Sequence, residues 1–193
     1  MTMGMHIRDS AAIRQLIETD HDMMAIIGAV AELRLPDGWI AAGFVRNRVW
    51  DVLHDYARPT PLADIDVIYF DPVDRTKTAE KTIEAALHSS LSSLPWSVKN
   101  QARMAERNGD PPYRSTLDAL GYWCETPTAV AVRLGVDGKL ELAAPLGIDD
   151  LLNLIVRPTP YARAHPRKLV AYRTRMAEKS WPALWPRLTV LDL

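Results

Sequence analysis

Two aspartates separated by one residue, Asp64 and Asp66, form the pattern in this sequence that points most directly to a chemistry. They open the segment Asp64–Asp71, which is rich in β-branched and aromatic residues and is bounded by prolines, so it predicts a β-strand. Side chains two apart on a strand leave the same face, and the two carboxylates can converge on one or two cations. Such oxygen ligands suit Mg²⁺ or Mn²⁺, so we predict that Asp64 and Asp66 are catalytic metal ligands. The alternative interpretation is a solvent-facing strand edge.

A second pattern lies upstream, where the predicted short strand Trp39–Phe44 meets the predicted helix Val45–Tyr56. Glycine at position 43 allows a ligand to approach the backbone, and the first amides of a helix bind phosphate. Arg46 adds a planar fork of donors, and Asn47 adds another donor. The sequence therefore predicts a phosphate-binding turn formed by Gly43, Arg46 and Asn47.

A third polar group, Lys99, Asn100 and Arg103, follows the predicted strand Trp96–Lys99. We place these three residues on the nucleotide or acceptor side of the site. The alternative is that they only tie the strand to the next element. Cys124 and the isolated histidines lack metal-site spacing and are interpreted as structural or surface residues.

Further segments must position these residues. Helical spacing of apolar residues predicts helices over 11–18, 21–34, 78–94, 115–122, 148–156 and 166–179. Strands are expected at 128–134 and 139–142, on either side of a Gly135–Gly138 turn whose Asp-Gly pair indicates a hairpin. The Trp-Pro pairs at 181 and 185 predict an irregular strap pinned by its indoles. The order of elements predicts a mixed α+β fold in which helices flank a mixed sheet.

Over about residues 22–175, the sequence resembles the bacterial nucleotidyltransferase-like proteins of the DNA polymerase beta superfamily. The resemblance rests on six segments: 42–51 (AGFVRNRVWD), 64–71 (DIDVIYFD), 98–103 (VKNQAR), 112–115 (PYRS), 125–130 (ETPTAV) and 156–160 (VRPTP). It implies a polymerase-beta-like core and nucleotidyl transfer. The nucleotide site would comprise Gly43, Arg46, Asn47, Lys99, Asn100 and Arg103.

Two features depart from the superfamily pattern. Active members carry Gly-Gly or Gly-Ser about a dozen residues before the acidic pair, whereas here Phe44 follows Gly43 and the pair arrives 21 residues later. The superfamily also places a third acid on a neighbouring strand, but the strand at 96–99 contains none. We therefore keep three hypotheses: metal-dependent nucleotidyl transfer from a nucleoside triphosphate to an unknown acceptor, a catalytically weak nucleotide-binding or protein-interaction module, and metal-dependent hydrolysis of a phosphate ester.

Charge divides the chain unevenly although the net charge is only −1. Residues 1–156 carry 15 basic and 22 acidic side chains, whereas residues 157–193 carry 8 basic and 2 acidic ones. We expect a core at 1–156 with two N-terminal helices, and a basic helix and strap at 157–193 that pack on it. The basic part could instead face an anionic partner. Because the resemblance implies no nucleic-acid partner, we expect no tight RNA or DNA binding.

Composition places the chain among globular proteins, with 193 residues of which 48% are hydrophobic. The opening residues 1–8 lack the apolar run of a secretory signal, and no apolar stretch reaches the roughly 20 residues of a membrane span. The single cysteine fits a reducing compartment. We expect a cytoplasmic protein without a membrane partner.

Overall fold

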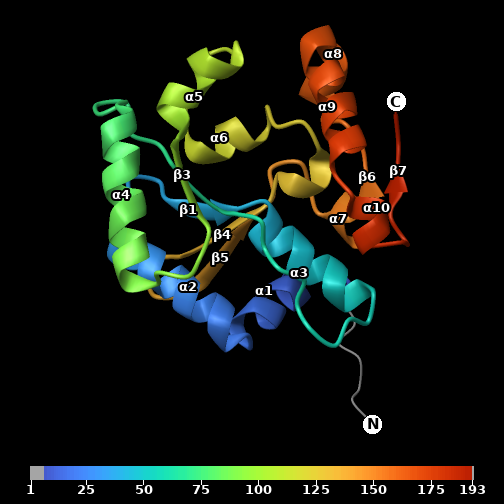
Figure 1. The fold of residues 1–193 in the computed structure, drawn as a ribbon, viewed down its shortest axis with the longest axis horizontal. Helices are drawn as coiled ribbons and strands as arrows, with labels where there is room; N and C mark the ends of the chain where they lie inside the picture. The colour runs from blue at the N-terminus through green and yellow to red at the C-terminus, as the bar shows by residue number, and fades with distance from the viewer. Residues whose placement is uncertain (1–6, 193) are drawn as a thin grey trace.

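The computed structural model describes residues 7–192, so most of the segment in which we expect no secretory signal lies outside the described residues. Its centre is a five-stranded mixed sheet with helices on both sides (Figure 1). The strands are β1 (Trp39–Ala41), β2 (Ile65–Tyr69), β3 (Trp96–Asn100), β4 (Ala131–Leu134) and β5 (Leu140–Ala143). Their order is β3-β2-β1-β4-β5, and only β2 and β3 pair in parallel.

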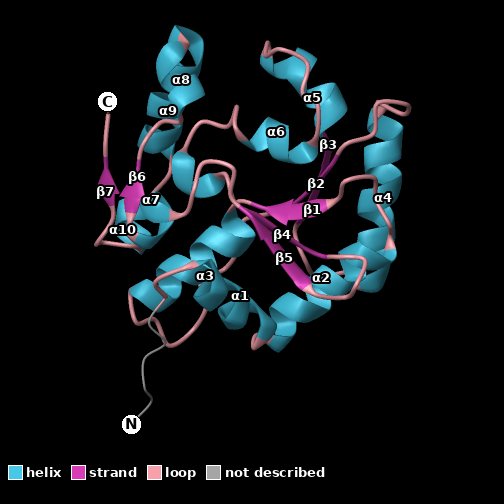
Figure 2. Ribbon diagram, turned by 180° about the vertical axis from the view of Figure 1, so that it is seen from behind, coloured by secondary structure: helices cyan, strands magenta, loops and turns pink. Residues whose placement is uncertain are grey.

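Four helices cover one face of the sheet (Figure 2). They are α1 (Ser10–Glu18), α2 (His21–Glu32), α3 (Gly43–Leu53) and α4 (Lys77–Ser90). Side chains of Asp9, Asp20 and Thr76 cap the starts of α1, α2 and α4 by accepting backbone N–H groups. Apolar residues of these helices and the inward side chains of the strands form the main core. This core fixes which face of each strand remains for the site.

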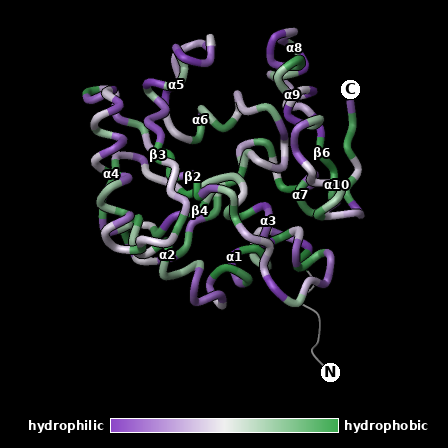
Figure 3. The backbone as a smooth tube through the Cα atoms, in the orientation of Figure 1, coloured by the Kyte–Doolittle hydropathy of each residue, from purple (hydrophilic) through white to green (hydrophobic). Residues whose placement is uncertain are grey.

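The opposite face carries α5 (Gln101–Asn108), α6 (Thr116–Leu120) and a short 3₁₀ turn, η1 (Thr126–Thr128). Figure 3 shows that α5 is largely hydrophilic whereas β2 and β4 are hydrophobic. For this reason apolar spacing did not predict α5, although its cap residues, Asn100 and the left-handed Gly109, are recognisable signals.

The C-terminal part forms a layer beside the sheet. It contains α7 (Asp149–Leu152), β6 (Ile155–Val156), α8 (Pro160–Ala164), α9 (Pro166–Glu178), α10 (Trp181–Leu184) and β7 (Thr189–Val190). Strands β6 and β7 pair in parallel, and the hydroxyl of the buried Tyr172 of α9 lies within hydrogen-bond distance of the carbonyl oxygens of Val156 and Leu191. Trp181 and Trp185 pack edge-on against Trp50 of α3.

Several predicted elements differ in the structure. The helix expected at 148–156 is wrong in its second half, because Leu154 adopts a positive φ of 58° and β6 follows. The five-residue α8 was not predicted, and α10 replaces part of the expected irregular strap. The hairpin of β4 and β5 and the strand at Asp66 are present. Within residues 7–192, no helix is long and apolar enough to cross a membrane.

Candidate active site

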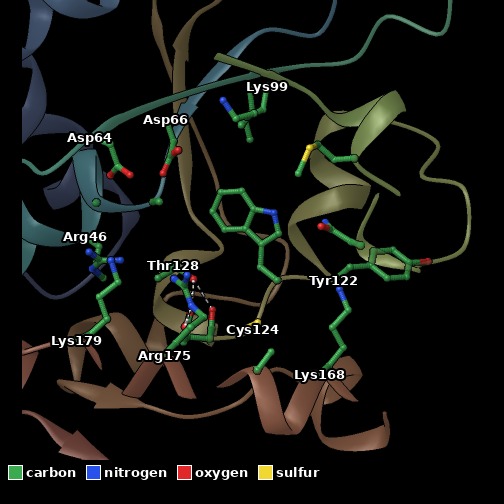
Figure 4. A pocket seen from close by; sticks show the side chains of 18 of the residues that line it. Arg46, Asp64, Asp66, Lys99, Tyr122, Cys124, Thr128, Lys168, Arg175 and Lys179 are labelled. Carbon is green, nitrogen blue, oxygen red and sulfur yellow. Dashed lines mark hydrogen bonds and ion pairs between the residues drawn. The ribbon is translucent and has the colours of Figure 1, made fainter. Parts of the chain in front are cut away.

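A cavity of about 520 Å³ lies on the face of the sheet that bears α5 and α6, with α9 and α10 forming its other wall (Figure 4). Five of the predicted site residues line it: Gly43, Arg46, Asp64, Asp66 and Lys99. Three others do not belong to its lining: Asn47, Asn100 and Arg103. The structure therefore brings the acidic pair and two residues of the turn that we predict to bind phosphate, Gly43 and Arg46, to one cavity.

Strand alternation places Asp64 and Asp66 on the cavity side of β2. Asp64 immediately precedes the strand and is exposed, whereas Asp66 lies within it and is half-buried. Ile68 lines the cavity on the same side, while Ile65 and Val67 point to the other face and are fully buried in the core. The core thus determines that both carboxylates face the cavity.

Burial and the neighbouring Asp64 raise the pKa of Asp66 from 3.8 to about 6. Ser97, which lies opposite Asp66 in the β2–β3 pair, offsets part of this rise by hydrogen bonding, as do the charges of Arg46 and Lys99. Two carboxylates that repel each other would be stabilised by a divalent cation between them. Ser97 also occupies the position on the neighbouring strand where a third acid could have stood.

The turn between β1 and α3 lies directly beside the acidic pair, because Ala41 pairs with Asp66 across β1 and β2. Ala42 takes φ 56° and ψ −121°, an unusual conformation for a residue with a side chain, and donates its N–H to Val130. Helix α3 then starts at Gly43 without a side-chain cap. The first amides of α3 are thus without a capping side chain where a phosphate could bind.

Glycine at position 43 is needed for space rather than for backbone conformation. A Cβ atom at Gly43 would lie 3.3 Å from Nη2 of Arg46 and 3.6 Å from Oδ1 of Asn47. The strained conformation belongs to Ala42 instead, which the sequence did not reveal. A side chain at position 43 would therefore crowd the guanidinium.

Arg46 is a buried charge of the site that has no ion-pair partner among the described residues. It is 7% exposed, its guanidinium stacks on Trp181 at 4.2 Å, and Trp50 lies 5.2 Å away. Burial lowers the pKa of Arg46 to about 10, so the group stays charged at neutral pH. It takes part in no ion pair among residues 7–192, and its buried Nε has no hydrogen-bond partner there. A buried, unpaired guanidinium at a cavity wall is suited to an anionic ligand.

Asn47 acts on Arg46 rather than on the cavity, since its Oδ1 accepts a hydrogen bond of 2.8 Å from Nη2 of Arg46. Asp51, the acid one turn further along α3, does not pair with Arg46. Its carboxylate accepts hydrogen bonds from Thr60 and from the indole of Trp185. Arg46 therefore forms no ion pair with Asp51.

The Lys99, Asn100 and Arg103 group is divided by the structure. Lys99 lines the cavity, whereas Asn100 is fully buried and binds the backbone of Asp71 and caps α5. Arg103 forms a two-pronged ion pair with Glu80 of α4, with the shortest contact at 2.7 Å. Asn100 and Arg103 therefore connect β3 to its neighbouring segments, as the alternative interpretation of this group expects.

Sequence reasoning assigned no role to Glu125, which is 1% exposed and also lines the cavity. Its carboxylate accepts 2.5 Å and 3.1 Å hydrogen bonds from Arg175 of α9 and from Thr128. Among the described residues, no group of three or more His, Cys, Asp or Glu could hold a metal ion. Glu125 therefore links α9 to the cavity wall and leaves Asp64 and Asp66 as the candidate metal ligands.

The family of the chain follows from comparison with known proteins. Residues 28–190 match the nucleotidyltransferase family, and the chain belongs to it. The expected family and mixed α+β fold are thus confirmed, and so is the predicted enzyme class at the level of the family. No curated protein matches the sequence at a significant level.

Two solved structures extend this result. The chain is similar to a protein whose NMR structure "reveals a CCA-adding enzyme head domain", with 34% identity and a TM-score of 0.89 over 98% of this chain and 100% of that one. It also matches a CCA-adding enzyme in complex with CTP, with 16% identity and a TM-score of 0.52, over 87% of this chain and 40% of that one. The second likeness concerns the fold alone. Family and fold together support nucleotidyl transfer as the general activity.

Proposed function

We propose that the protein transfers a nucleotidyl group from a nucleoside triphosphate to an acceptor, with Mg²⁺ or Mn²⁺ held by Asp64 and Asp66. The observation that carries this proposal is the meeting of three features in one cavity. The acidic pair lies beside the uncapped start of α3, and the unpaired guanidinium of Arg46 faces the same space. Together they offer ligands for a metal and for the phosphates that it accompanies.

The acidic pair fits a hard divalent cation. Two carboxylates from one strand face supply oxygen ligands, and burial together with the nearby charge of Asp64 raises the pKa of Asp66 in the metal-free protein. Mg²⁺ commonly takes one or two carboxylates and completes its shell with water and phosphate oxygens. The metal would supply charge neutralisation for the attacking and leaving oxygens.

The residues of the chain hold and orient the substrate in this reaction. The amides at Gly43 and the guanidinium of Arg46 bind triphosphate oxygens, and Trp181 and Asn47 hold Arg46 in place. The acceptor oxygen forms a bond to the α-phosphorus, the bond from that phosphorus to the bridging oxygen breaks, and pyrophosphate leaves. The proton of the acceptor is released to solvent.

A second function, nucleotide binding without turnover, has one observation in its favour. Ser97 stands opposite Asp66 on β3, so the neighbouring strand brings no third carboxylate to the pair. Only a turnover measurement separates a weak catalyst from a binding module, because both would bind metal and triphosphate.

The test is incubation with each of four α-labelled triphosphates and Mn²⁺ or Mg²⁺, together with pools of RNA, protein and metabolite acceptors. We expect label in one acceptor pool and release of pyrophosphate from wild-type protein. Asp66→Asn should abolish both. Asp22→Asn is the matched control, because Asp22 is an exposed acid of α2. Triphosphate binding without label transfer in every pool would favour the binding module, and equal transfer by Asp66→Asn would refute the proposal.

A further inference from the structure

Helix α9 presents a row of cations to the cavity. Lys168, Ala171 and Arg175 line it at helical spacing, and Lys179 continues the row just after the helix ends. Figure 4 shows Lys168, Arg175 and Lys179 along one side of the cavity, across from Lys99 and the acidic pair. Arg173 lies on another face of the helix and pairs with Asp192. The cavity therefore has a basic wall along much of α9.

This row is longer than one triphosphate. Lys179 lies eleven positions after Lys168, which corresponds to about 16 Å at the rise of an α-helix. Lys179 lies at the end of the cavity near Arg46, whereas Lys168 lies at the other end near Tyr122. Successive phosphates of a triphosphate share one bridging oxygen, so a triphosphate held at Arg46 cannot also reach Lys168. The phosphates of a triphosphate at Arg46 therefore leave the cations of the Lys168 end without an anionic group.

The balance of charge along the cavity also leaves cations over. Six cationic and three acidic side chains line the cavity. A fourth acid, Asp110, lies outside the lining and forms an ion pair with Lys168. Glu125 is already paired with Arg175. Arg167, at the Lys168 end, takes part in no ion pair among residues 7–192. An exposed guanidinium that has no ion pair among those residues and lies at this end of the cavity suits an anionic group of a ligand.

The Lys168 end is held by buried contacts. The carboxylate of Asp110 accepts hydrogen bonds from Lys168, at 2.7 Å, and from the hydroxyl of Tyr113. The side chain of Asp110 is fully buried, so the ion pair holds the ammonium group of Lys168 in place from the interior of the protein. Tyr122 lines the cavity here and packs against Tyr113 and Tyr161, with ring centroids 4.9 and 4.5 Å apart. These contacts therefore fix the positions of the Lys168 ammonium group and of the Tyr122 ring.

We propose that Arg167, Lys168 and Tyr122 form an acceptor subsite for a substrate that carries a phosphate group next to its reacting hydroxyl. This inference rests on the proposed function, because the subsite would place that hydroxyl between the basic wall and the triphosphate at Arg46. A sugar phosphate and the 3′ end of an RNA strand share this chemistry. With only two cations at this end, the affinity is modest and depends on salt.

The test measures binding directly, with and without Mg²⁺ and ATP. Ribose 5-phosphate is titrated by calorimetry with unphosphorylated ribose as the blank, and a fluorescently labelled 12-nucleotide RNA is titrated by anisotropy. We expect one of the two probes to bind wild-type protein. Arg167→Glu should weaken that binding at least tenfold and leave ATP affinity within twofold. Arg163→Glu is the matched control, because Arg163 is an exposed cation of α8 outside the cavity lining, and it should change neither.

The outcomes separate the subsite from the proposed function. Binding of ribose 5-phosphate alone identifies a small phosphorylated acceptor, and binding of RNA alone identifies a strand end. If a probe binds in a way that depends on Arg167 but ATP does not bind, the proposed function is refuted. The Arg167 and Lys168 region would then be an anion-binding site only. The subsite is refuted if neither probe binds, or if Arg167→Glu binds as well as wild type.

Discussion

At the scale of single residues, the site contains a partly buried acid, Asp66, and a buried cation, Arg46. Asp66 is partly buried beside another acid, so its charged form is destabilised, and Arg46 is buried without an acidic partner. Each group is costly for the protein alone. On the proposed function, both costs would fall when a divalent cation and a phosphate bind together.

The raised pKa of Asp66 can be tested through the pH dependence of the free energy of unfolding. Because the folded state raises the pKa of Asp66 from 3.8 to about 6, the folded protein binds this proton more tightly than the unfolded one. The contribution of Asp66 to the free energy of unfolding is therefore present below about pH 4 and is lost as pH rises through about 6. Metal-free Asp66→Asn should lack this decrease in urea titrations. A decrease equal to that of wild type would contradict the assignment of the pKa.

Substitution of Arg46 tests the phosphate contact. Arg46→Ala should weaken triphosphate binding or turnover on the order of 10²-fold, since a preorganised cation facing the phosphates is lost. Arg48→Ala is the control, because Arg48 pairs with Asp20 at 3.0 Å outside the cavity lining. Calorimetry with ATP and Mg²⁺ measures the effect. Unchanged affinity and turnover in Arg46→Ala would make this arginine structural.

At the scale of elements, the turn between β1 and α3 positions the residues that we propose to bind the phosphates. Ala42 carries the strained conformation, and Gly43 leaves room for the guanidinium of Arg46. A strained backbone conformation costs about 1–3 kcal/mol and is often found at functional sites. The two neighbouring positions should therefore respond to substitution in opposite ways.

We expect Ala42→Gly to keep or raise the melting temperature, because glycine adopts this conformation without steric cost. Gly43→Ala should fold but lose affinity for triphosphate, because its Cβ would lie 3.3 Å from Nη2 of Arg46. Thermal melts and ATP calorimetry of both variants provide the measurement. The interpretation of the turn fails if Gly43→Ala binds ATP like wild type.

The C-terminal helix α10 also contributes to the site, because Trp181 stacks on Arg46. Trp181→Leu keeps an apolar, though smaller, side chain and removes a cation–π contact worth about 0.5–2 kcal/mol, so ATP binding should weaken roughly two- to thirtyfold. Leu184→Ala, an exposed position of the same helix, is the control. A raised KM with kcat nearly unchanged would indicate positioning of Arg46. Equal affinity in wild type and Trp181→Leu would exclude it.

At the scale of the whole molecule, the sequence predicted the parts of the site that are local in the chain. Strand alternation placed Asp64 and Asp66 on one face, and the glycine turn placed Arg46 at a helix start. It could not predict that Glu125 and Arg175 meet across the cavity, because 50 residues separate them. Nor could it show that the side-chain amide of Asn100 donates a hydrogen bond to the backbone carbonyl of Asp71. Contacts between distant segments depend on the packed core and not on local spacing.

The same limit applies to the C-terminal part. Its basic composition is evident in the sequence, yet only the fold shows that α9 turns Lys168 and Arg175 to the cavity and Arg173 away from it. The division of the chain at residues 156 and 157 stays a prediction, as does a cytoplasmic location.

The claim that Asp64 and Asp66 hold the metal is tested most directly by an Mn²⁺ titration followed by electron paramagnetic resonance, with and without a non-hydrolysable triphosphate. Wild-type protein should bind Mn²⁺, and binding should tighten with triphosphate and weaken as pH falls below about 6, where Asp66 becomes protonated. The double variant Asp64→Asn with Asp66→Asn should leave all Mn²⁺ free while retaining a wild-type circular dichroism spectrum. Undiminished Mn²⁺ binding by that variant would contradict the account.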